Sequence, residues 1–424
     1  MQSSYAQKLL SFIDKSPTAF HTVASLISEL EANGFQKLEE SESWNIKEST
    51  HYYVCRADGS IIAFRTPSKW SKNSTFKIVG SHTDSPSLKV KSNPSTTKEG
   101  YQLLNIEVYG GALLTSWFDK DLLLGGRVLY EDHEGLLVSK LIELPSRLRI
   151  PRLAIHLDKK VNKEGFLVNP QEHLCPILGL QQDFDFEAWV KKETSIQGNL
   201  LSWDLFLFDA EKSSFGGINE EFIFASRLDN LASVHASLSA LLASATHEND
   251  FLIGAFLQHE EIGSTSQNGA NSNFMEAILK RMLLSFSEEQ ETFFRTIASS
   301  FFISTDMTHA VHPSYASAHD QQHKPMLNHG PVIKNNANMR YASDAFSIAK
   351  FKQWCHKAGV PFQDFCNRND MGCGSTIGPM VSANLGIPTI DIGNAMLSMH
   401  SIREMAGVED HNMMIDVFKA FYSK

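Results

Sequence analysis

The sequence predicts an α/β protein in which helices cover both faces of a mostly parallel sheet, with a separate β-rich module inserted into it. After about residue 207, apolar strand-like runs alternate with longer segments of helical periodicity, an order typical of a parallel sheet between two helical layers. Between about 94 and 206 the pattern changes to short alternating segments, with no convincing long helix until about 184. We therefore expect a discontinuous domain of residues 1–93 and 207–424 and an inserted, mostly β module at 94–206.

The part of the chain before the insert combines helices with short strands. Apolar side chains recur at three- and four-residue spacing between residues 5 and 34 and stop at Asn33-Gly34, which predicts two helices. Three short runs rich in β-branched and aromatic residues predict strands at Tyr52–Cys55, Ser60–Arg65 and Phe76–Gly80. The third strand leads directly into Ser-His-Thr-Asp-Ser-Pro, so these polar residues follow a strand end.

The part after the insert alternates helices and strands. The pattern predicts helices at about 229–245, 273–285, 342–358 and 375–385. It predicts strands at 251–257 (FLIGAFL), 301–304 (FFIS), about 361–366 and 387–393 (IPTIDIG). Open α/β sheets bind their ligands in the crevice outside the carboxyl ends of such strands, so we expect functional residues there.

Composition narrows the classes of partner. The 38 Lys and Arg residues against 48 Asp and Glu leave a formal charge of −10, which repels phosphate backbones and anionic lipids. No apolar run reaches the roughly 18–20 residues of a membrane span, and the first residues lack the basic and long apolar regions of a secretory signal. We expect a cytoplasmic protein with no nucleic-acid partner and no membrane partner.

Histidines and carboxylates gather just past the predicted buried strands and at the start of the 229–245 helix: His82, Asp84, Asp229, His259, Glu260, Glu261, Asp306, His309 and His400. The five cysteines include no C-x-x-C pair, so a metal site here must use imidazoles and carboxylates. Such a donor set suits Zn²⁺, Co²⁺ or Mn²⁺. One carboxylate can bridge two ions, as in co-catalytic hydrolases.

The spacing of these residues suggests different roles for neighbours. Asp84 stands two positions after His82, where a carboxylate can orient a ligating imidazole. Glu260 and Glu261 are adjacent and point to opposite sides of an extended chain, so one can bind a metal while the other acts as general base. Each residue alone is more often an ordinary loop residue, and it is their convergence on one sheet edge that favours a metal site. Histidines outside this pattern, such as His235 and His411, are expected to be surface or core residues.

Nine runs spread over the whole chain form a more specific pattern than any single motif. They are VGSHTDSPSLKVK (79–91), FDKDLLLGGRV (118–128), RLAIHLD (152–158), SRLDNLAS (226–233), HEEIGS (259–264), STDMTHAVHP (304–313), GPVIKNNANMRYASDA (330–345), CGSTIGP (373–379) and MHSIREM (399–405). In these runs and their order the sequence resembles the aspartyl aminopeptidase family of cytoplasmic dinuclear metallopeptidases.

The resemblance implies two divalent metal ions per subunit, Zn²⁺ first among them. By position it implies His82 and Asp306 as ligands of the first ion, Glu261 and His400 as ligands of the second, and Asp229 as the bridge. Glu260 matches the catalytic base. From its spacing to His82, we expect Asp84 to be the second catalytic residue.

The resemblance also carries expectations for substrate and assembly. Lys334, His309 and Tyr341 match positions that line the substrate side of the pocket, and His156 matches a residue that reaches into the neighbouring subunit's active site. The inserted module resembles the family's dimerisation domain, and the implied assembly is a homo-oligomer, a dodecamer built from dimers.

These expectations describe an aminopeptidase that releases N-terminal residues, acidic ones by resemblance, from peptides. Three alternatives stay open: a deacylase or carboxypeptidase of the same dinuclear class, an aminopeptidase that prefers a neutral first residue, and a non-catalytic scaffold or cargo protein that has kept the fold. A non-catalytic relative would be expected to lack some site residues, and this sequence has them all: His82, Asp229, Glu260, Glu261, Asp306 and His400.

Overall fold

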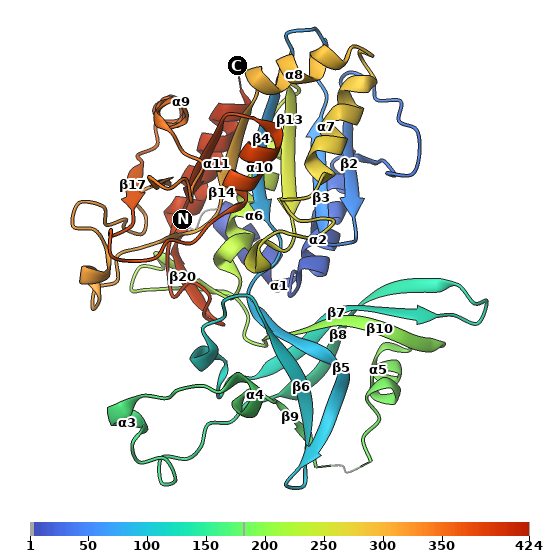
Figure 1. Cartoon of the computed structure of the whole chain (residues 1–424), viewed down its shortest axis with the longest axis vertical. Helices are drawn as coiled ribbons and strands as arrows, with labels where there is room; N and C mark the ends of the chain where they lie inside the picture. The colour runs from blue at the N-terminus through green and yellow to red at the C-terminus, as the bar shows by residue number, and fades with distance from the viewer. Residues whose placement is uncertain (1–3, 181–182, 424) are drawn as a thin grey trace.

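The larger domain is built on a nine-stranded sheet in the computed structural model, which describes residues 4–180 and 183–423 (Figure 1). In spatial order its strands are β1 (Gln36–Lys37), β2 (His51–Arg56), β3 (Ser60–Arg65), β13 (Phe251–Leu257), β4 (Phe76–His82), β14 (Phe301–Thr305), β18 (Thr389–Gly393), β16 (Val332–Asn335) and β17 (Gln363–Cys366).

Among the described residues this sheet has five parallel and three antiparallel strand pairs, so it is mostly parallel, as expected, but mixed in detail. The central strands β13, β4, β14 and β18 run parallel, as do the edge pairs β1–β2 and β16–β17. The pairs β2–β3, β3–β13 and β16–β18 are antiparallel. The turn between β2 and β3 is too short for a parallel crossover, which needs a dozen or more residues. The parallel order therefore holds for the centre of the sheet, where the strand-end residues lie.

Helices pack on both faces of the sheet, as expected. On one face lie α1 (Ser4–Asp14), α2 (Ala19–Ala32), α6 (Leu228–Ala243), α9 (Ala345–Ala358) and α11 (Val408–Tyr422). On the other face lie α7 (Phe274–Leu284), α8 (Gln290–Ser299) and α10 (Ile377–Leu385). Adjacent residues of a strand serve opposite faces, so Val79 packs in the first core and Ile78 in the second.

Helix α11 and strand β16 were not predicted from the sequence pattern, and neither was helix α8. Two of its buried positions, Thr292 and Thr296, are polar, which leaves a short apolar stripe of Phe293 and Ile297. Helix α9, in contrast, was predicted, because residues at its two ends define where it begins and where it ends. Asp344 accepts a hydrogen bond from the backbone N–H of Ser347 in a capping box. Among the helices of residues 4–180 and 183–423, none has the length and apolar character that a bilayer span requires.

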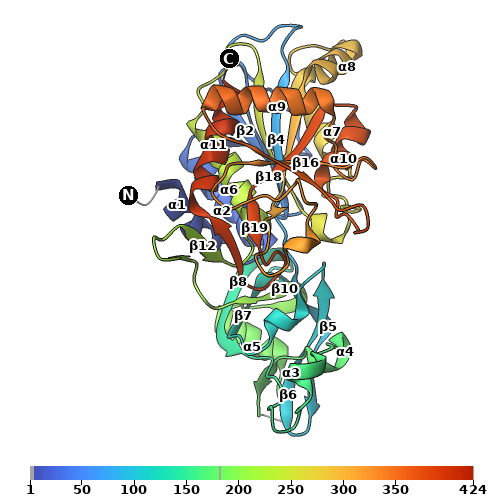
Figure 2. The ribbon, with the colours of Figure 1, turned by 90° about the vertical axis from the view of Figure 1, so that its left-hand side faces the viewer.

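The smaller domain extends from one end of the larger one (Figures 1 and 2). Its antiparallel sheet has the order β8 (Leu137–Leu148), β7 (Leu122–Glu131), β10 (Asn199–Asp209), β5 (Ser87–Lys98), β6 (Tyr101–Tyr109) and β9 (Ile177–Gly179). The helices of this part are α3 (Val161–Glu164), α4 (Pro170–His173) and α5 (Phe186–Thr194). Strands β5 and β10 cross the limits expected at 94 and 206, so the sheet begins earlier and ends later along the chain.

A third sheet of five short strands links the chain after β10 to the C-terminal segment within the described residues. Its order is β11 (Ser214–Gly216), β12 (Phe222–Ala225), β20 (Glu404–Gly407), β19 (Ala395–Leu397) and β15 (Thr308–His309). Short 3₁₀ turns occur at η1 (Leu114–Trp117), η2 (Glu260–Ile262) and η3 (Ala316–Ala318). The turn between β19 and β20 contains His400, so this small sheet fixes the position of that residue.

Two buried histidines join α6 to α11. The Nδ1 atom of His235 lies 2.8 Å from the Nε2 atom of His411, a distance at which one neutral ring donates a hydrogen bond to the other. Burial lowers the pKa of His235 to about 3 and holds the pKa of His411 well below its ordinary value. Both residues therefore belong to the core, one of the two roles expected for them.

We predict that this pair makes the fold acid-sensitive. The folded-state pKa of His235 lies below the unfolded value of 6.5, so its contribution to stability is complete above pH 6.5 and is lost as the pH falls toward 3. His235→Gln should reduce the loss of unfolding free energy between pH 8 and pH 5 by about 2 kcal/mol. Urea unfolding at the two pH values measures this difference. His133→Gln, an exposed histidine between β7 and β8, should leave it unchanged, and an unaltered pH dependence in the His235 variant would contradict the prediction.

Candidate metal centre

The strand-end residues converge at the carboxyl edge of the central strands. His82 is the last residue of β4, the Glu260-Glu261 pair follows β13 in η2, and Asp306 directly follows β14. Because β13, β4 and β14 are parallel neighbours, their carboxyl ends lie side by side. His400 differs from the expectation, since it follows the extra strand β19 rather than β18.

The first group of possible ligands consists of His82, Asp229 and Asp306. The Nε2 atom of His82 lies 3.3 Å from Asp229 Oδ1 and 3.4 Å from Asp306 Oδ1. All three residues are buried, and one ligand atom from each lies within 4.8 Å of the others. This spacing allows the three atoms to hold a single ion.

The second group shares Asp229 with the first. The Nε2 atom of His400 lies 3.4 Å from Asp229 Oδ2 and 3.5 Å from Glu261 Oε2. Asp229 therefore directs one carboxylate oxygen to His82 and the other to His400. Glu260 lies between the groups, with Oε2 4.0 Å from His82 Nε2, and a third set of ligand atoms comes from His82, Glu260 and Glu261.

The hydrogen bonds of the two imidazoles show that cations fit this site. The Nδ1 atom of His82 lies 3.0 Å from the backbone oxygen of Asp84, and that of His400 lies 3.0 Å from the backbone oxygen of Gly111. A carbonyl oxygen only accepts, so each Nδ1 carries the hydrogen and each neutral ring turns its Nε2 lone pair toward carboxylates. A cation between them removes the repulsion of these lone pairs.

Unpartnered oxygens point to the same conclusion. Oδ1 of Asp229 and Oε1 of Glu261 are buried without a hydrogen-bond donor among the described residues, and an unpaired buried carboxylate oxygen is costly. Burial by itself would lower the pKa of His400, but the carboxylates of Asp229 and Glu261 raise it to about 10. A field that holds a proton so strongly also attracts a metal ion, and two imidazoles with three carboxylates suit Zn²⁺.

Glu260 lies in the turn that follows β13, and Asp84 binds the backbone of this turn. Burial raises the pKa of the Glu260 carboxyl to about 8, opposed by His82 and supported by the surrounding carboxylates. The Asp84 carboxylate accepts hydrogen bonds from the backbone N–H groups of Glu260 and Glu261, both at 3.2 Å. The Nδ1 atom of His82 lies 3.0 Å from the carbonyl oxygen of Asp84 and 3.7 Å from its carboxylate oxygen Oδ1, so Asp84 contacts both the imidazole and the turn.

Among the residues expected to line the substrate pocket, Lys334 lies beside Asp306 and Tyr341 lies beside Lys334. Lys334, on β16, is buried, and its Nζ atom lies 3.4 Å from Asp306 Oδ2 and 5.4 Å from the centre of the Tyr341 ring. His309 is exposed on the short strand β15. His156 lies in an exposed segment of the smaller domain, and no hydrogen bond or ion pair joins it to the centre within the described residues.

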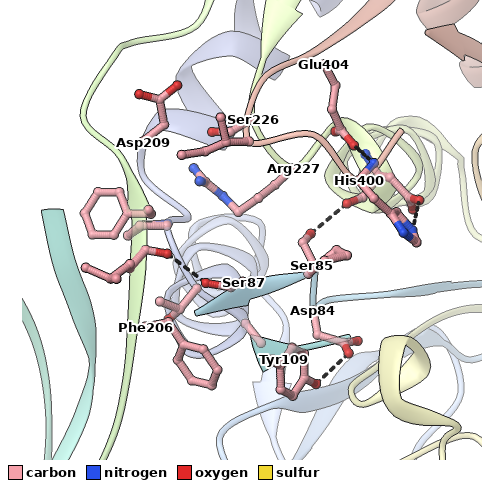
Figure 3. A pocket seen from close by; sticks show the side chains of 18 of the residues that line it. Asp84, Ser85, Ser87, Tyr109, Phe206, Asp209, Ser226, Arg227, His400 and Glu404 are labelled. Atoms are coloured by element: carbon pink, nitrogen blue, oxygen red, sulfur yellow. Dashed lines mark hydrogen bonds and ion pairs between the residues drawn. The ribbon is translucent and has the colours of Figure 1, made fainter. Parts of the chain in front are cut away.

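Glu404 is a residue of the centre that the strand-end pattern missed. Its carboxylate accepts a hydrogen bond from the backbone N–H of His400 at 2.8 Å (Figure 3). It accepts another from the backbone N–H of Asp229 at 3.2 Å. Burial, together with the charge of Asp229, raises the pKa of Glu404 to about 8. Its signal in the sequence was its place in the run MHSIREM, because it follows no strand of the main sheet. It fixes the backbone of two metal ligands at once.

A shared carboxylate between two histidine-containing groups, with a protonatable glutamate beside them, is the arrangement of a metal-dependent hydrolase. Residues 12–422 match the family model described as aminopeptidase I zinc metalloprotease (M18). The chain therefore belongs to the M18 family of zinc aminopeptidases, hydrolases that act on peptide bonds. The resemblance found in the sequence is confirmed.

Known proteins similar to this chain agree with the family. A probable M18 family aminopeptidase 2 of Pseudomonas aeruginosa (strain LESB58) is 43% identical over 432 residues, which cover 100% of this chain and 99% of the relative. The cryo-EM structure of the Ape4 and Nbr1 complex matches with a TM-score of 0.94 at 37% identity, covering 99% of this chain and 85% of that chain. The structure of the S. cerevisiae mApe1 dodecamer matches with a TM-score of 0.86 at 28% identity, covering 99% of this chain and 96% of that chain.

Proposed function

We propose that the chain is a dinuclear aminopeptidase that binds two zinc ions and releases acidic N-terminal residues from peptides. The observation that carries the dinuclear site is the shared carboxylate, since Asp229 offers one oxygen to each imidazole. One ion would be held by His82 and Asp306, the other by Glu261 and His400, with Asp229 common to both. Co²⁺ or Mn²⁺ would fit the same oxygen and nitrogen donors.

The residues of this chain supply the proton transfers of peptide hydrolysis. When bound, two divalent ions lower the pKa of water and polarise the substrate carbonyl. Glu260 accepts the proton of the attacking water and returns it to the leaving amine. Asp84 keeps the backbone of Glu260 in place for both transfers.

The carboxylates around the centre also favour a free amino terminus. An α-ammonium group beside Asp306 and Glu260 gains charge-assisted hydrogen bonds that an acylated amine lacks. This preference separates an aminopeptidase from the deacylase and carboxypeptidase alternatives, and the relatives named as aminopeptidases support it.

The acidic preference is supported by Lys334. An ammonium group is rarely buried without an anion, and an acidic side chain of the substrate would supply one. The alternative is that Lys334 only neutralises Asp306, from which its Nζ atom is 3.4 Å away. An enzyme of that kind would accept neutral first residues, the remaining alternative for specificity.

We propose a homo-oligomer, a dodecamer built from dimers, in which the smaller domain forms the dimer contact. Segment 151–170 of this domain exposes Leu153, Ile155, Leu157 and Leu167, the last with 92% of its surface accessible. Clustered exposed apolar side chains mark an interaction surface. His156 lies between two of them, so the same contact would carry it toward a partner subunit's centre. The likeness to the mApe1 dodecamer supports this assembly.

The first prediction tests the general base. Glu260→Gln keeps the size of the side chain but cannot take up a proton, so kcat should fall by ~10²–10⁴-fold. Elemental analysis should still find two zinc ions per chain, and thermal unfolding should be unchanged. Glu291→Gln, exposed on α8, is the matched control. Near-normal turnover in a metal-loaded Glu260 variant would remove this residue from the mechanism.

The second prediction tests specificity. Lys334→Met should lower kcat/KM for Asp- and Glu-arylamides by the equivalent of ~1.5–3 kcal/mol, because a charged hydrogen bond is lost. Values for Leu- and Ala-arylamides should change little. Lys324→Met removes a positive charge outside the centre, so it controls for the loss of charge alone. Equal losses on acidic and neutral substrates would support the neutralising role instead.

The third prediction tests the shared site. His156→Ala and Glu260→Gln subunits, each inactive alone, are dissociated, mixed in equal amounts and reassembled. Random pairing places an intact Glu260 beside a partner's intact His156 in about a quarter of the sites, and activity should recover to that extent. Each variant reassembled with itself is the control. No recovery in verified mixed oligomers, or full activity of an isolated monomer, would refute the shared site.

A further inference from the structure

The second strand of the smaller domain ends at the metal centre. Tyr109 is the last residue of β6, and its hydroxyl donates a hydrogen bond of 2.7 Å to Oδ2 of Asp84 (Figure 3). The Tyr109 ring packs edge-on against Phe206 of β10, with the ring centres 5.5 Å apart. Two strands of the smaller domain therefore set where this hydroxyl lies.

The two glycines that follow Tyr109 approach two expected metal ligands. Gly110 has a φ of +70°, and a Cβ atom at this position would lie 3.1 Å from Cβ of Glu261. The carbonyl oxygen of Gly111 accepts the hydrogen of His400 Nδ1, and a Cβ atom on Gly111 would lie 3.3 Å from that nitrogen. Three consecutive residues thus contact Asp84, Glu261 and His400 in turn.

A second hydrogen bond joins His400 to the segment that follows Tyr109. The backbone N–H of Leu113 donates to the carbonyl oxygen of His400 at 2.8 Å. His400 therefore has its ring and its backbone bonded to the smaller domain, while Glu404 bonds its backbone N–H from β20. Asp84 is shared in the same way, because its carboxylate receives Tyr109 from one domain and the Glu260-Glu261 turn from the other.

We propose that Tyr109 is a positioning residue, which places Asp84 and thereby the Glu260-Glu261 turn, so that segment 109–113 of the smaller domain completes the metal centre. This inference rests on the proposed dinuclear site. Without the Tyr109 hydroxyl, the one hydrogen bond left to Oδ2 of Asp84 among the described residues comes from the backbone N–H of Glu261. The carboxylate can then rotate, and the turn that presents Glu261 to the metal loses its fixed support.

The test compares zinc affinity in Tyr109→Phe with that of the unchanged protein. Phe retains the ring that packs on Phe206 and removes only the hydroxyl. Loss of a group that supports a ligand costs about 10–100-fold in metal affinity, which competition with a chromophoric chelator measures. The visible spectrum of the Co²⁺-substituted protein should shift as well. Tyr101→Phe, exposed on the same strand, is the matched control and should change neither reading.

A second variant keeps the proposal falsifiable if Tyr109→Phe folds poorly. Gly111→Ala pushes a methyl group toward His400 and should weaken the ion of that group more than the other. Binding of fewer than two zinc ions by the unchanged protein would overturn the proposed function itself. Two ions in the unchanged protein, with the affinity and Co²⁺ spectrum of both variants unaltered, would overturn the positioning role alone, whatever happens to activity.

Discussion

The Asp229 carboxylate has ligand atoms of Asp306 and of Glu261 each within 4.8 Å in a buried site, and the repulsion between these carboxylates has to be balanced by positive charge. In a medium of low polarity this repulsion is large and water cannot screen it. Lys334 balances part of it from one side. The two imidazoles can balance the rest only as protonated rings or as ligands of a cation, because both turn Nε2 toward carboxylates. The cluster of carboxylates is therefore stable when positive charge, from protonated imidazoles or a bound cation, lies inside it.

The main sheet brings these charged side chains together. Parallel strands β13, β4 and β14 bring three carboxylates and an imidazole to one edge, and helices on both faces keep that edge rigid. The strands that join the central parallel strands through antiparallel pairs, β3 and β16, carry none of the expected metal ligands, and β16 contributes Lys334 beside Asp306. The small third sheet then has one task at the centre, which is to bring His400 and Glu404 back to Asp229.

The site residues that could be predicted from the sequence are those whose pattern lies in a short stretch of the chain. His82, Glu260, Glu261 and Asp306 were found because a buried strand and the residue after it are adjacent in sequence. Glu404 and Tyr109 act through contacts that join distant parts of the chain, and no periodicity marks them. Strands β5 (Ser87–Lys98) and β10 (Asn199–Asp209) of the smaller sheet extend past the expected limits at 94 and 206, and no sequence pattern marked their outer ends.

The close approach of Gly110 and Gly111 bears on how the length of this chain can change. Surface loops ordinarily accept added or missing residues with little harm. Between β6 and η1 a single added or deleted residue would shift the Gly111 carbonyl from His400 and bring a different residue opposite Glu261. The two domains are thus joined in a fixed register, and the smaller one cannot be trimmed away or exchanged as an independent unit. Variation in length is confined to places that leave this segment untouched, such as the turn at Glu134-Gly135 between β7 and β8.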